Sequence, residues 1–252
     1  MNQYELIHFC DTLLQSRSFK DYCPNGLQVE GSRKIKKIIL GVSICEELID
    51  LAIQQKGDMI LTHHGLFWDK QENRILGAMK KKLTKLINAG IACAAYHLPL
   101  DFHDTIGNNF QLAKKLGLKK IISLPPEGKG DQKVGILGEV RKQTIEAFTK
   151  VVATELSREP FVLPYGPKII QKVAITTGGG QGYFPDMVHF GADCFITGEV
   201  SEYNYSQSRE LQSHFIAAGH YATEKYGVLA LGRELEKKFG VQTLFIDIEN
   251  PI

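Results

Sequence analysis

Two adjacent histidines, His63 and His64, close an apolar run that begins after Gly57, and Gly65 follows them. The short apolar segment 59–61 predicts a buried strand. Because successive side chains on a strand point to opposite faces, both imidazoles can serve one site only where the strand ends and the backbone turns. Ligands of open α/β sheets bind at that carboxyl edge. The pair therefore suggests a metal centre. The alternative is two loop histidines that are hydrogen-bonded to water or backbone.

Three further apolar runs also end in imidazole or carboxylate side chains, namely His97 with Asp101, Glu199, and His220 with Glu224. His220 and Glu224 stand four residues apart where a helix is expected to begin, and this spacing places them on one helix face. Imidazole and carboxylate without thiolate suit Zn, Fe, Mn, Ni or Co at a catalytic type of site. The set is larger than one ion needs, whereas two ions about 3.5–4 Å apart would use it and would favour hydrolysis.

The glycine-rich segment Gly178–Gly182 follows an apolar run and offers two interpretations. It is a tight turn, or its backbone N–H groups contact a phosphate or another part of a substrate. It is not a dinucleotide fingerprint, because Tyr183 occupies the third glycine position, and the sequence has no GK[ST] motif. Among the other histidines, His8 and His214 are expected to be structural, and His103 is close enough to Asp101 to orient it or to relay a proton.

Strands that alternate with helices predict a parallel, layered α/β architecture. We expect helices at 4–14, 46–55, 75–88, 108–116, 144–155, 202–211 and 223–239, and strands at 38–42, 59–62, 91–96, 134–137, 173–176, 194–197, 215–218 and 243–248. The segment Pro125–Asp131 reads as a linker and divides the chain into domains 1–125 and 126–252. Strands that end in polar residues recur in both halves. This similarity between the halves indicates a duplication. The alternative is coincidence, because the sequences of buried strands resemble one another.

Composition excludes several classes of protein. A net charge of +2 gives no argument for nucleic acid, although a patch inside a ring would escape a net count. The lysines at 80–82 read as a solvated helix face. No segment approaches the roughly 18 apolar residues of a membrane span, and the N-terminus does not resemble a signal peptide. The five cysteines lack a CxxC motif. They are expected to be reduced, as in the cytoplasm, and distant from the candidate ligands.

At these residues the sequence resembles the Ngg-interacting-factor-three-like family, which includes the bacterial YbgI proteins and is commonly labelled "GTP cyclohydrolase 1 type 2 homologue". The matching motifs extend over nearly the whole chain and are Asn25–Gly31, Thr62–Phe67, His97–Asp101 with Gly107–Asn109, Thr197–Glu199 and Gly219–Glu224. Many relatives carry proline where this chain has Gly65. Longer relatives carry a further domain between the halves, and the short segment Pro125–Asp131 leaves no room for one.

The resemblance implies two related α/β halves that face each other across a metal-containing cleft, a toroidal homohexamer and a dinuclear metal centre. By position, the ligands of the family match His63, His64, Asp101, His220 and Glu224, with His97 close by. The label suggests opening of a guanine ring by metal-activated water. The cysteine and histidine zinc signature of ordinary type I GTP cyclohydrolases is missing from this sequence.

The preferred hypothesis is a cytoplasmic, metal-dependent hydrolase with two divalent ions that acts on a nucleotide-like or phosphorylated small molecule. His97 or Glu199 would act as general base or acid. Tyr203, Gly179 and Gly180 would contact the substrate. The rival hypothesis is a metal-binding chaperone or regulatory hexamer that uses the same ligands without turnover. A ring that binds nucleic acid is a third hypothesis, and the net charge does not support it.

Overall fold

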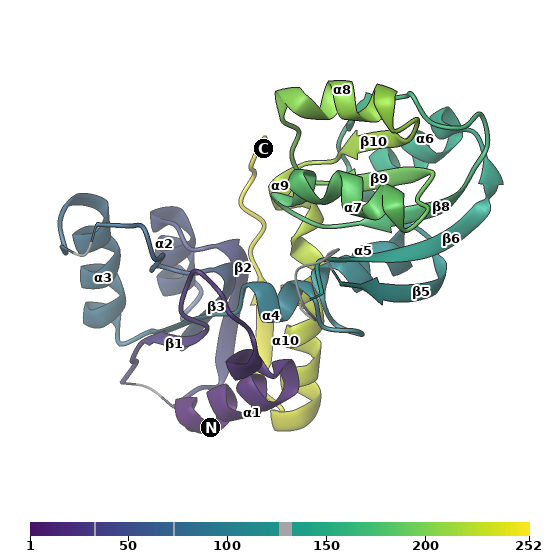
Figure 1. Ribbon diagram of the computed structural model, residues 1–252. Coiled ribbons are helices and arrows are strands. Elements are labelled where there is room, and N and C mark those ends of the chain that lie inside the picture. Colours follow the sequence, from purple (N-terminus) through teal and green to yellow (C-terminus); the bar gives the residue numbers. More distant parts are fainter. Residues whose placement is uncertain (33, 73, 126–132) are drawn as a thin grey trace. The chain divides into compact units, whose positions relative to one another are not determined.

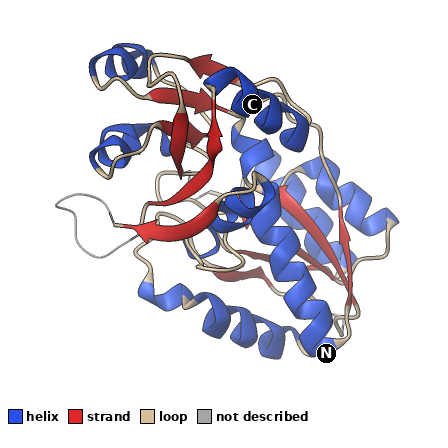
Figure 2. Cartoon of the chain, turned by 90° about the vertical axis from the view of Figure 1, so that its right-hand side faces the viewer, coloured by secondary structure: helices blue, strands red, loops and turns tan. Residues whose placement is uncertain are grey.

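The computed structural model describes residues 1–32, 34–72, 74–125 and 133–252, in which helices and strands alternate along the chain (Figures 1 and 2). The chain forms two compact units. Unit 1 comprises Met1–Leu100 with Gly227–Glu249, and unit 2 comprises Asp101–Tyr226 with Asn250–Ile252. These bounds differ from the expected division after residue 125, because the C-terminal strand pairs within unit 1. Most of the expected linker, residues 126–132, lies outside the described part of the chain.

Unit 1 contains a five-stranded sheet in the order β1-β4-β3-β2-β11. All neighbouring strands are parallel except β1, which is antiparallel to β4. The three central strands are almost entirely buried, which explains why their sequences are continuous apolar runs rather than alternating ones. The strands are β1 (Gly26–Val29), β2 (Lys37–Ser43), β3 (Met59–His64), β4 (Ala92–Ala95) and β11 (Gln242–Phe245). The helices are α1 (Gln3–Leu14), η1 (Ser16–Ser18), α2 (Glu46–Gln54) and α3 (Gly77–Ala89), with most of α10 (Lys225–Phe239).

Unit 2 contains a six-stranded sheet in the order β5-β6-β8-β9-β10-β7. Only β8, β9 and β10 are mutually parallel, so the expectation of a parallel architecture holds for the centre of this sheet and not for its edges. The strands are β5 (Lys119–Leu124), β6 (Gly135–Gln143), β7 (Phe161–Leu163), β8 (Ile170–Ile175), β9 (Cys194–Thr197) and β10 (His214–Ala217). The helices are α5 (Asn108–Lys115), α6 (Ile145–Leu156), η2 (Gly180–Tyr183), α7 (Phe184–His189), α8 (Glu202–Glu210) and α9 (His220–Thr223); α4 (Leu98–Asp101) begins in unit 1.

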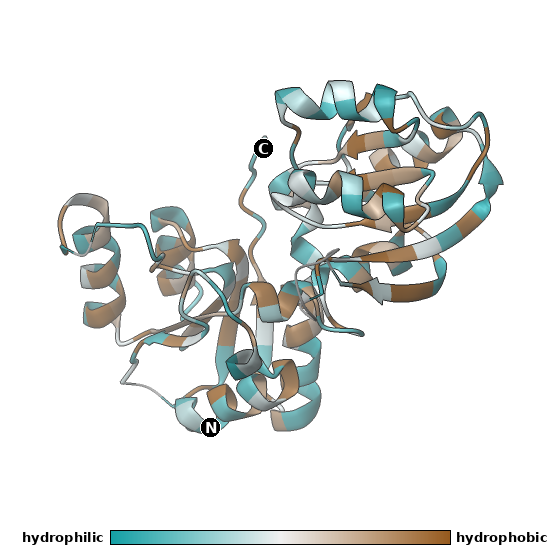
Figure 3. Cartoon of the chain, in the orientation of Figure 1, coloured by the Kyte–Doolittle hydropathy of each residue, from teal (hydrophilic) through white to brown (hydrophobic). Residues whose placement is uncertain are grey.

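Each unit is stabilised by its own apolar core. In unit 1 the core lies between the sheet and helices α2 and α3, and it includes Ile39, Leu48 and Leu86. In unit 2 two clusters cover the sheet, one of them around Phe148 and the other around Phe195. The central strands are correspondingly coloured as apolar in Figure 3. No helix in the described ranges has the length and apolar character that a transmembrane crossing requires.

The expected helix 223–239 is α10, which begins two residues later than expected and is preceded by the one-turn helix α9. α9 ends at Thr223 and α10 begins at Lys225, and Glu224 between them adopts φ −109° and ψ 12°. In addition, β3 extends through His64, two residues further than expected. Strands β1, β5 and β7 and the short helices α4 and α7 were not predicted, because they are short or contain polar residues without a clear period.

The two halves of the sequence follow one order of elements. The order α1-β1-β2-α2-β3-α3-β4-α4-α5 corresponds to α6-β7-β8-α7-β9-α8-β10-α9-α10. In both sheets three parallel strands adjoin an antiparallel edge strand, β1 or β7. Asp58 and Asp193 precede corresponding strands, and Oδ2 of each accepts hydrogen bonds from two successive backbone N–H groups at 2.7–2.9 Å. This correspondence supports duplication over coincidence.

Candidate metal centre

Three histidines meet at the carboxyl edge of the sheet in unit 1. His63 and His64 end β3, and His97 lies two residues beyond β4, its parallel neighbour. One ring nitrogen of each lies within 4.8 Å of the others. The ring centroids are 4.5 Å apart for His63 and His64 and 5.1 Å apart for His63 and His97. The adjacent histidines therefore do reach one place, although β3 continues through both.

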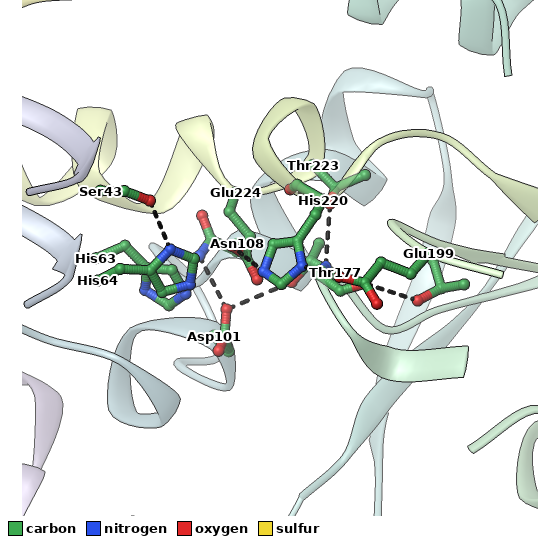
Figure 4. Close-up of polar contacts among 12 residues, drawn as sticks. Ser43, His63, His64, Asp101, Asn108, Thr177, Glu199, His220, Thr223 and Glu224 are labelled. Atoms are coloured by element: carbon green, nitrogen blue, oxygen red, sulfur yellow. Dashed lines mark hydrogen bonds and ion pairs between the residues drawn. The ribbon is translucent and has the colours of Figure 1, made fainter. Parts of the chain in front are cut away.

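Hydrogen bonds at Nδ1 orient the first two imidazoles. Nδ1 of His63 lies 2.9 Å from the carbonyl oxygen of Tyr96. Because a carbonyl only accepts, this nitrogen carries the proton, and Nε2 keeps the lone pair that a metal ion requires. Nδ1 of His64 lies 2.8 Å from Oγ of Ser43, a hydroxyl that can donate or accept (Figure 4). His63 is fully buried, so its ring has little freedom to turn.

Asp21 holds the third imidazole. Its Oδ1 accepts a hydrogen bond from Nδ1 of His97 at 2.9 Å, and its Oδ2 accepts from the backbone N–H of Leu98 and from Nδ2 of Asn25. Burial alone would raise the pKa of Asp21, but the hydrogen bonds, first of all that from His97, outweigh it and lower the pKa to about 2. A carboxylate that orients a histidine in this way is typical of metal sites.

Unit 2 contributes a second group, in which His220 lies between two carboxylates (Figure 4). Nε2 of His220 is 3.1 Å from Oε2 of Glu224, and Nδ1 is 2.7 Å from Oε1 of Glu199. The four-residue spacing thus brings His220 and Glu224 together, through the one-turn helix α9. Burial opposes the charged imidazole, but Glu224 and then Glu199 outweigh it and raise the pKa of His220 to about 9.

Asp101, the last residue of α4, is also buried. Its Oδ1 accepts hydrogen bonds from Nδ2 of Asn108 at 2.9 Å and from Oγ1 of Thr177 at 3.4 Å (Figure 4). The carboxylate is therefore oriented by residues 7 and 76 positions away in the sequence. Asn108 belongs to the sequence motif Gly107–Asn109, whereas no sequence pattern indicated Thr177.

The glycine segment packs against this second group. Gly178 has φ +64°, and a Cβ there would lie 1.9 Å from Oε1 of Glu224 and 3.1 Å from Nε2 of His220. The N–H of Gly178 donates to Oγ1 of Thr223 at 3.0 Å and is occupied within the protein. A Cβ at Gly180 would clash with the side chain of Thr176, the residue after β8. A Cβ at Gly179 would have no atom closer than 3.8 Å. Close packing thus accounts for Gly178 and Gly180.

Comparison with known proteins identifies the family of this chain. The model of the Duf34/NIF3 (NGG1p interacting factor 3) family matches residues 1–251. The chain belongs to the Duf34/NIF3 family. A relative from Haemophilus influenzae named "GTP cyclohydrolase 1 type 2 homolog" is 44% identical over the whole of both chains, and one of the same name from Pseudomonas aeruginosa is 41% identical over 98% of this chain and 97% of its own.

Solved structures of Duf34/NIF3 relatives have the same fold. One, described as "protein ybgI, unknown function", has a TM-score of 0.93 at 37% identity and covers all of both chains. Another, TTHA1606 from Thermus thermophilus, has a TM-score of 0.91 at 33% identity, also over all of both chains. The family resemblance and the α/β fold expected from the sequence are confirmed.

The other polar residues have local roles in this Duf34/NIF3 chain. The ring of His214 is hydrogen-bonded to the carbonyl of Pro167 at 2.8 Å and accepts the N–H of Gly166 at 3.1 Å, so it is structural. Nδ1 of His103 accepts from the N–H of Thr105 at 3.2 Å. Tyr203, on α8, is 45% exposed, and its contact with a substrate stays a prediction.

One expectation about the cysteines is wrong. Sγ of Cys23 lies 3.6 Å from Oδ1 of Asp21, and these two side chains and His97 form a further group of potential ligands. A cysteine therefore does lie beside the candidate ligands of the Duf34/NIF3 site. All five cysteines are free thiols, as expected. Burial raises the pKa of Cys93 to about 12, which makes that thiol unreactive.

The donor set fits divalent metal ions. Each unit presents imidazole or carboxylate groups. In each histidine of these groups and in Asp101, a hydrogen bond within the protein orients one polar atom, which is how metal ligands are held. The groups are His63, His64 and His97 in unit 1, and Asp101, His220 and Glu224 in unit 2.

Proposed function

We propose that this Duf34/NIF3 protein is a metal-dependent hydrolase that holds two divalent ions and acts on a nucleotide-like or phosphorylated small molecule. The proposed ligands are His63, His64, Asp101, His220 and Glu224. The observation that carries the proposal is the oriented donor set, in which carbonyl or carboxylate groups hold Nδ1 of His63 and His220, so that Nε2 is the ring nitrogen left to bind a metal ion. Divalent ions bound by such donors supply Lewis acidity for hydrolysis at neutral pH.

The remaining polar residues have roles in proton transfer and substrate contact. We assign general base or acid function to His97 or Glu199. Each is already part of a hydrogen-bonded pair, His97 with Asp21 and Glu199 with His220, so a proton can be held at a defined atom. Tyr203, Gly179 and Gly180 are proposed to contact the substrate. The names of the relatives support a nucleotide-like substrate.

The assembly and the compartment belong to the same proposal. We infer a homohexamer from the family resemblance, which size-exclusion chromatography with light scattering would test. The free cysteines support a reducing compartment, the cytoplasm.

The proposal is tested by elemental analysis and activity together. Reconstituted protein should hold about two ions per chain, and His64→Ala should lose metal and activity on a panel of nucleotides and phosphoesters. His8→Ala is the control, because His8 is an exposed histidine of α1 in the same unit. The elements present after purification identify the metal, which we expect among Zn, Fe, Mn, Ni and Co.

Two outcomes would contradict the hydrolase assignment. If His64→Ala hydrolyses every substrate as well as the parent protein does, these ligands do not serve catalysis. If the parent protein hydrolyses nothing and passes labile metal to an apo-enzyme, the rival hypothesis of a metal-binding chaperone or regulatory protein is correct. Tightly held metal with measurable turnover supports the proposal.

A further inference from the structure

Two aromatic side chains next to the histidines of unit 1 have no part in the function proposed so far. Trp68, the only tryptophan of the sequence, follows β3, and Tyr22 precedes β1. Their ring centroids are 6.0 Å apart, and their planes are inclined by 31°. The two rings are therefore tilted neighbours, although 46 positions separate them in the sequence.

This aromatic pair borders the imidazoles directly. The rings of Tyr22 and Trp68 both meet His97 edge to face, with centroids 5.0 and 5.2 Å away at 73° and 79°. Trp68 also lies 5.7 Å from His64. A molecule in contact with the aromatic pair would consequently lie beside the proposed metal ligands.

Backbone hydrogen bonds fix the two loops that carry the pair. The N–H of Asp69 donates to the carbonyl oxygen of Tyr22 at 2.9 Å, and the N–H of Tyr22 donates to Oδ1 of Asp21 at 2.8 Å. Oε1 of Gln28 accepts the N–H of Leu66 at 2.7 Å. The two loops are thus ordered before any ligand arrives, which lowers the entropic cost of binding.

The pair is also accessible. Tyr22 is 54% exposed, and Trp68 is only partly buried, although large aromatic side chains normally gain most from burial. Exposed aromatic surface beside a cluster of buried polar groups is typical of ligand sites. We propose that Tyr22 and Trp68 stack against the planar heteroaromatic ring of the substrate, a ring of the nucleobase class. This inference rests on the proposed function for the presence of a substrate, and it adds how the substrate is recognised.

Trp68 fluorescence tests the inference without requiring turnover. The probes are guanosine 5′-monophosphate, which has a planar ring, and ribose 5-phosphate, which lacks one, each added to the zinc-loaded protein. Guanosine 5′-monophosphate should quench the single tryptophan saturably, and ribose 5-phosphate should not. Tyr22→Leu should weaken nucleotide binding about tenfold, within the range measured for stacking of a base on an aromatic side chain. Trp68→Leu, measured by calorimetry, should have a similar effect, and Trp68→Phe a smaller one.

Tyr4→Leu is the matched control, because Tyr4 lies in the same unit and is 53% exposed. It should bind the nucleotide as the parent protein does. The zinc content of every variant should equal that of the parent, which shows that the fold and the ligands are intact. The inference is wrong if neither probe binds, if both bind equally well, or if Tyr22→Leu and Tyr4→Leu have the same affinity.

The two proposals fail in different ways. If the nucleotide binds through Tyr22 and Trp68 but no substrate is hydrolysed, stacking stands and the hydrolase assignment fails. If substrates are hydrolysed and Tyr22→Leu leaves their KM unchanged, the hydrolase assignment stands and stacking fails.

Discussion

Replacement of Asp21 by asparagine should destabilise unit 1. The side chain of Asp21 is only 3% exposed. Its oxygens accept from four nitrogen donors and, at 3.6 Å from Oδ1, from Sγ of Cys23. Oδ1 faces Nδ1 of His97 and the N–H of Tyr22, while Oδ2 faces the N–H of Leu98 and Nδ2 of Asn25. Whichever way the amide of Asp21→Asn is turned, its NH₂ group faces at least two of these donors, which then lose their acceptor.

The structure sets the size of this effect. A buried donor without an acceptor costs about 1–3 kcal/mol. The donors at Oδ2 are partly buried, so two of them, taken towards the lower end of that range, give a loss of about 3 kcal/mol in the free energy of unfolding. For a chain of this length, about 1 kcal/mol shifts the melting temperature by roughly 2–4 °C. Asp21→Asn should therefore melt about 6–12 °C below the parent protein in differential scanning calorimetry.

The effect should depend on pH in a defined direction. Burial alone would raise the pKa of Asp21, but hydrogen bonds led by that from His97 lower it from 3.8 to about 2 in the folded chain. A carboxylate with a lowered pKa contributes stability above its unfolded value, and the contribution is lost as the pH falls through the folded value. The difference in melting temperature between parent and Asp21→Asn should persist down to pH 3.8 and shrink between 3.8 and about 2.

Asp69→Asn is the control, since Asp69 is an exposed carboxylate in the neighbouring loop of the same unit. It should melt within about 1 °C of the parent, as surface substitutions usually do. If Asp21→Asn also melts within that margin at neutral pH, the hydrogen-bond reasoning fails.

Three further predictions concern the residues around His220 and the candidate metal centre as a whole. Glu199→Gln should lower metal affinity about 10–100-fold in chelator competition, because His220 loses the carboxylate at Nδ1. The control Glu202→Gln changes an exposed carboxylate and should leave metal affinity unchanged. Equal metal affinities for the two variants would refute this prediction. Gly178→Ala should lose metal and stability, because its Cβ would clash with Glu224. The control Gly240→Ala has the same φ of +64° and nothing within 4 Å of its Cβ, so it should cost only about 1 kcal/mol of backbone strain. Equal metal contents in the two variants would contradict this prediction. Removal of metal with a chelator should lower the melting temperature, since an ion bound only by the folded state stabilises it, and an unchanged melting curve would count against the centre.

Local sequence patterns were sufficient for the central strands and for the polar residues that follow them. β3, β4, β9 and β10 are apolar runs that end in polar side chains, and parallel neighbours place such ends at one edge. The edge strands β1 and β7 were missed because they have only four and three residues, too few for a strand pattern to stand out. The unit boundary was missed for another reason: the pairing of β11 with β2 joins segments about 200 positions apart, which no local pattern reveals.

The partners of the candidate ligands were also missing from the sequence analysis. Asp21 reaches His97 across 76 positions, and Ser43 reaches His64 across 21. Trp68 and Tyr22 likewise meet through their rings and through a hydrogen bond between their loops, across 46 positions of sequence. A residue that acts by orienting another has no characteristic spacing, so these contacts require the fold.

The internal repeat explains why the candidate ligands occur in two similar sets. His97 with Asp101 and His220 with Glu224 follow corresponding strands, β4 and β10, with the same four-residue spacing. Within each repeat the last helix and strand pack in the other unit: α5 and β5 belong to unit 2, and α10 and β11 to unit 1.

The chain thus passes from one unit to the other soon after each histidine, and both carboxylates stand at these crossings. Asp101 is the first residue of unit 2, and Glu224 precedes Gly227, where unit 1 resumes. The repeats differ at the ends of β3 and β9, where Thr62-His63-His64 corresponds to Thr197-Gly198-Glu199. The first repeat therefore supplies two imidazoles where the second supplies a carboxylate that orients His220. This divergence gives one repeat the additional candidate ligands and the other an acceptor for the imidazole N–H, so neither repeat alone contains the full set of proposed donors.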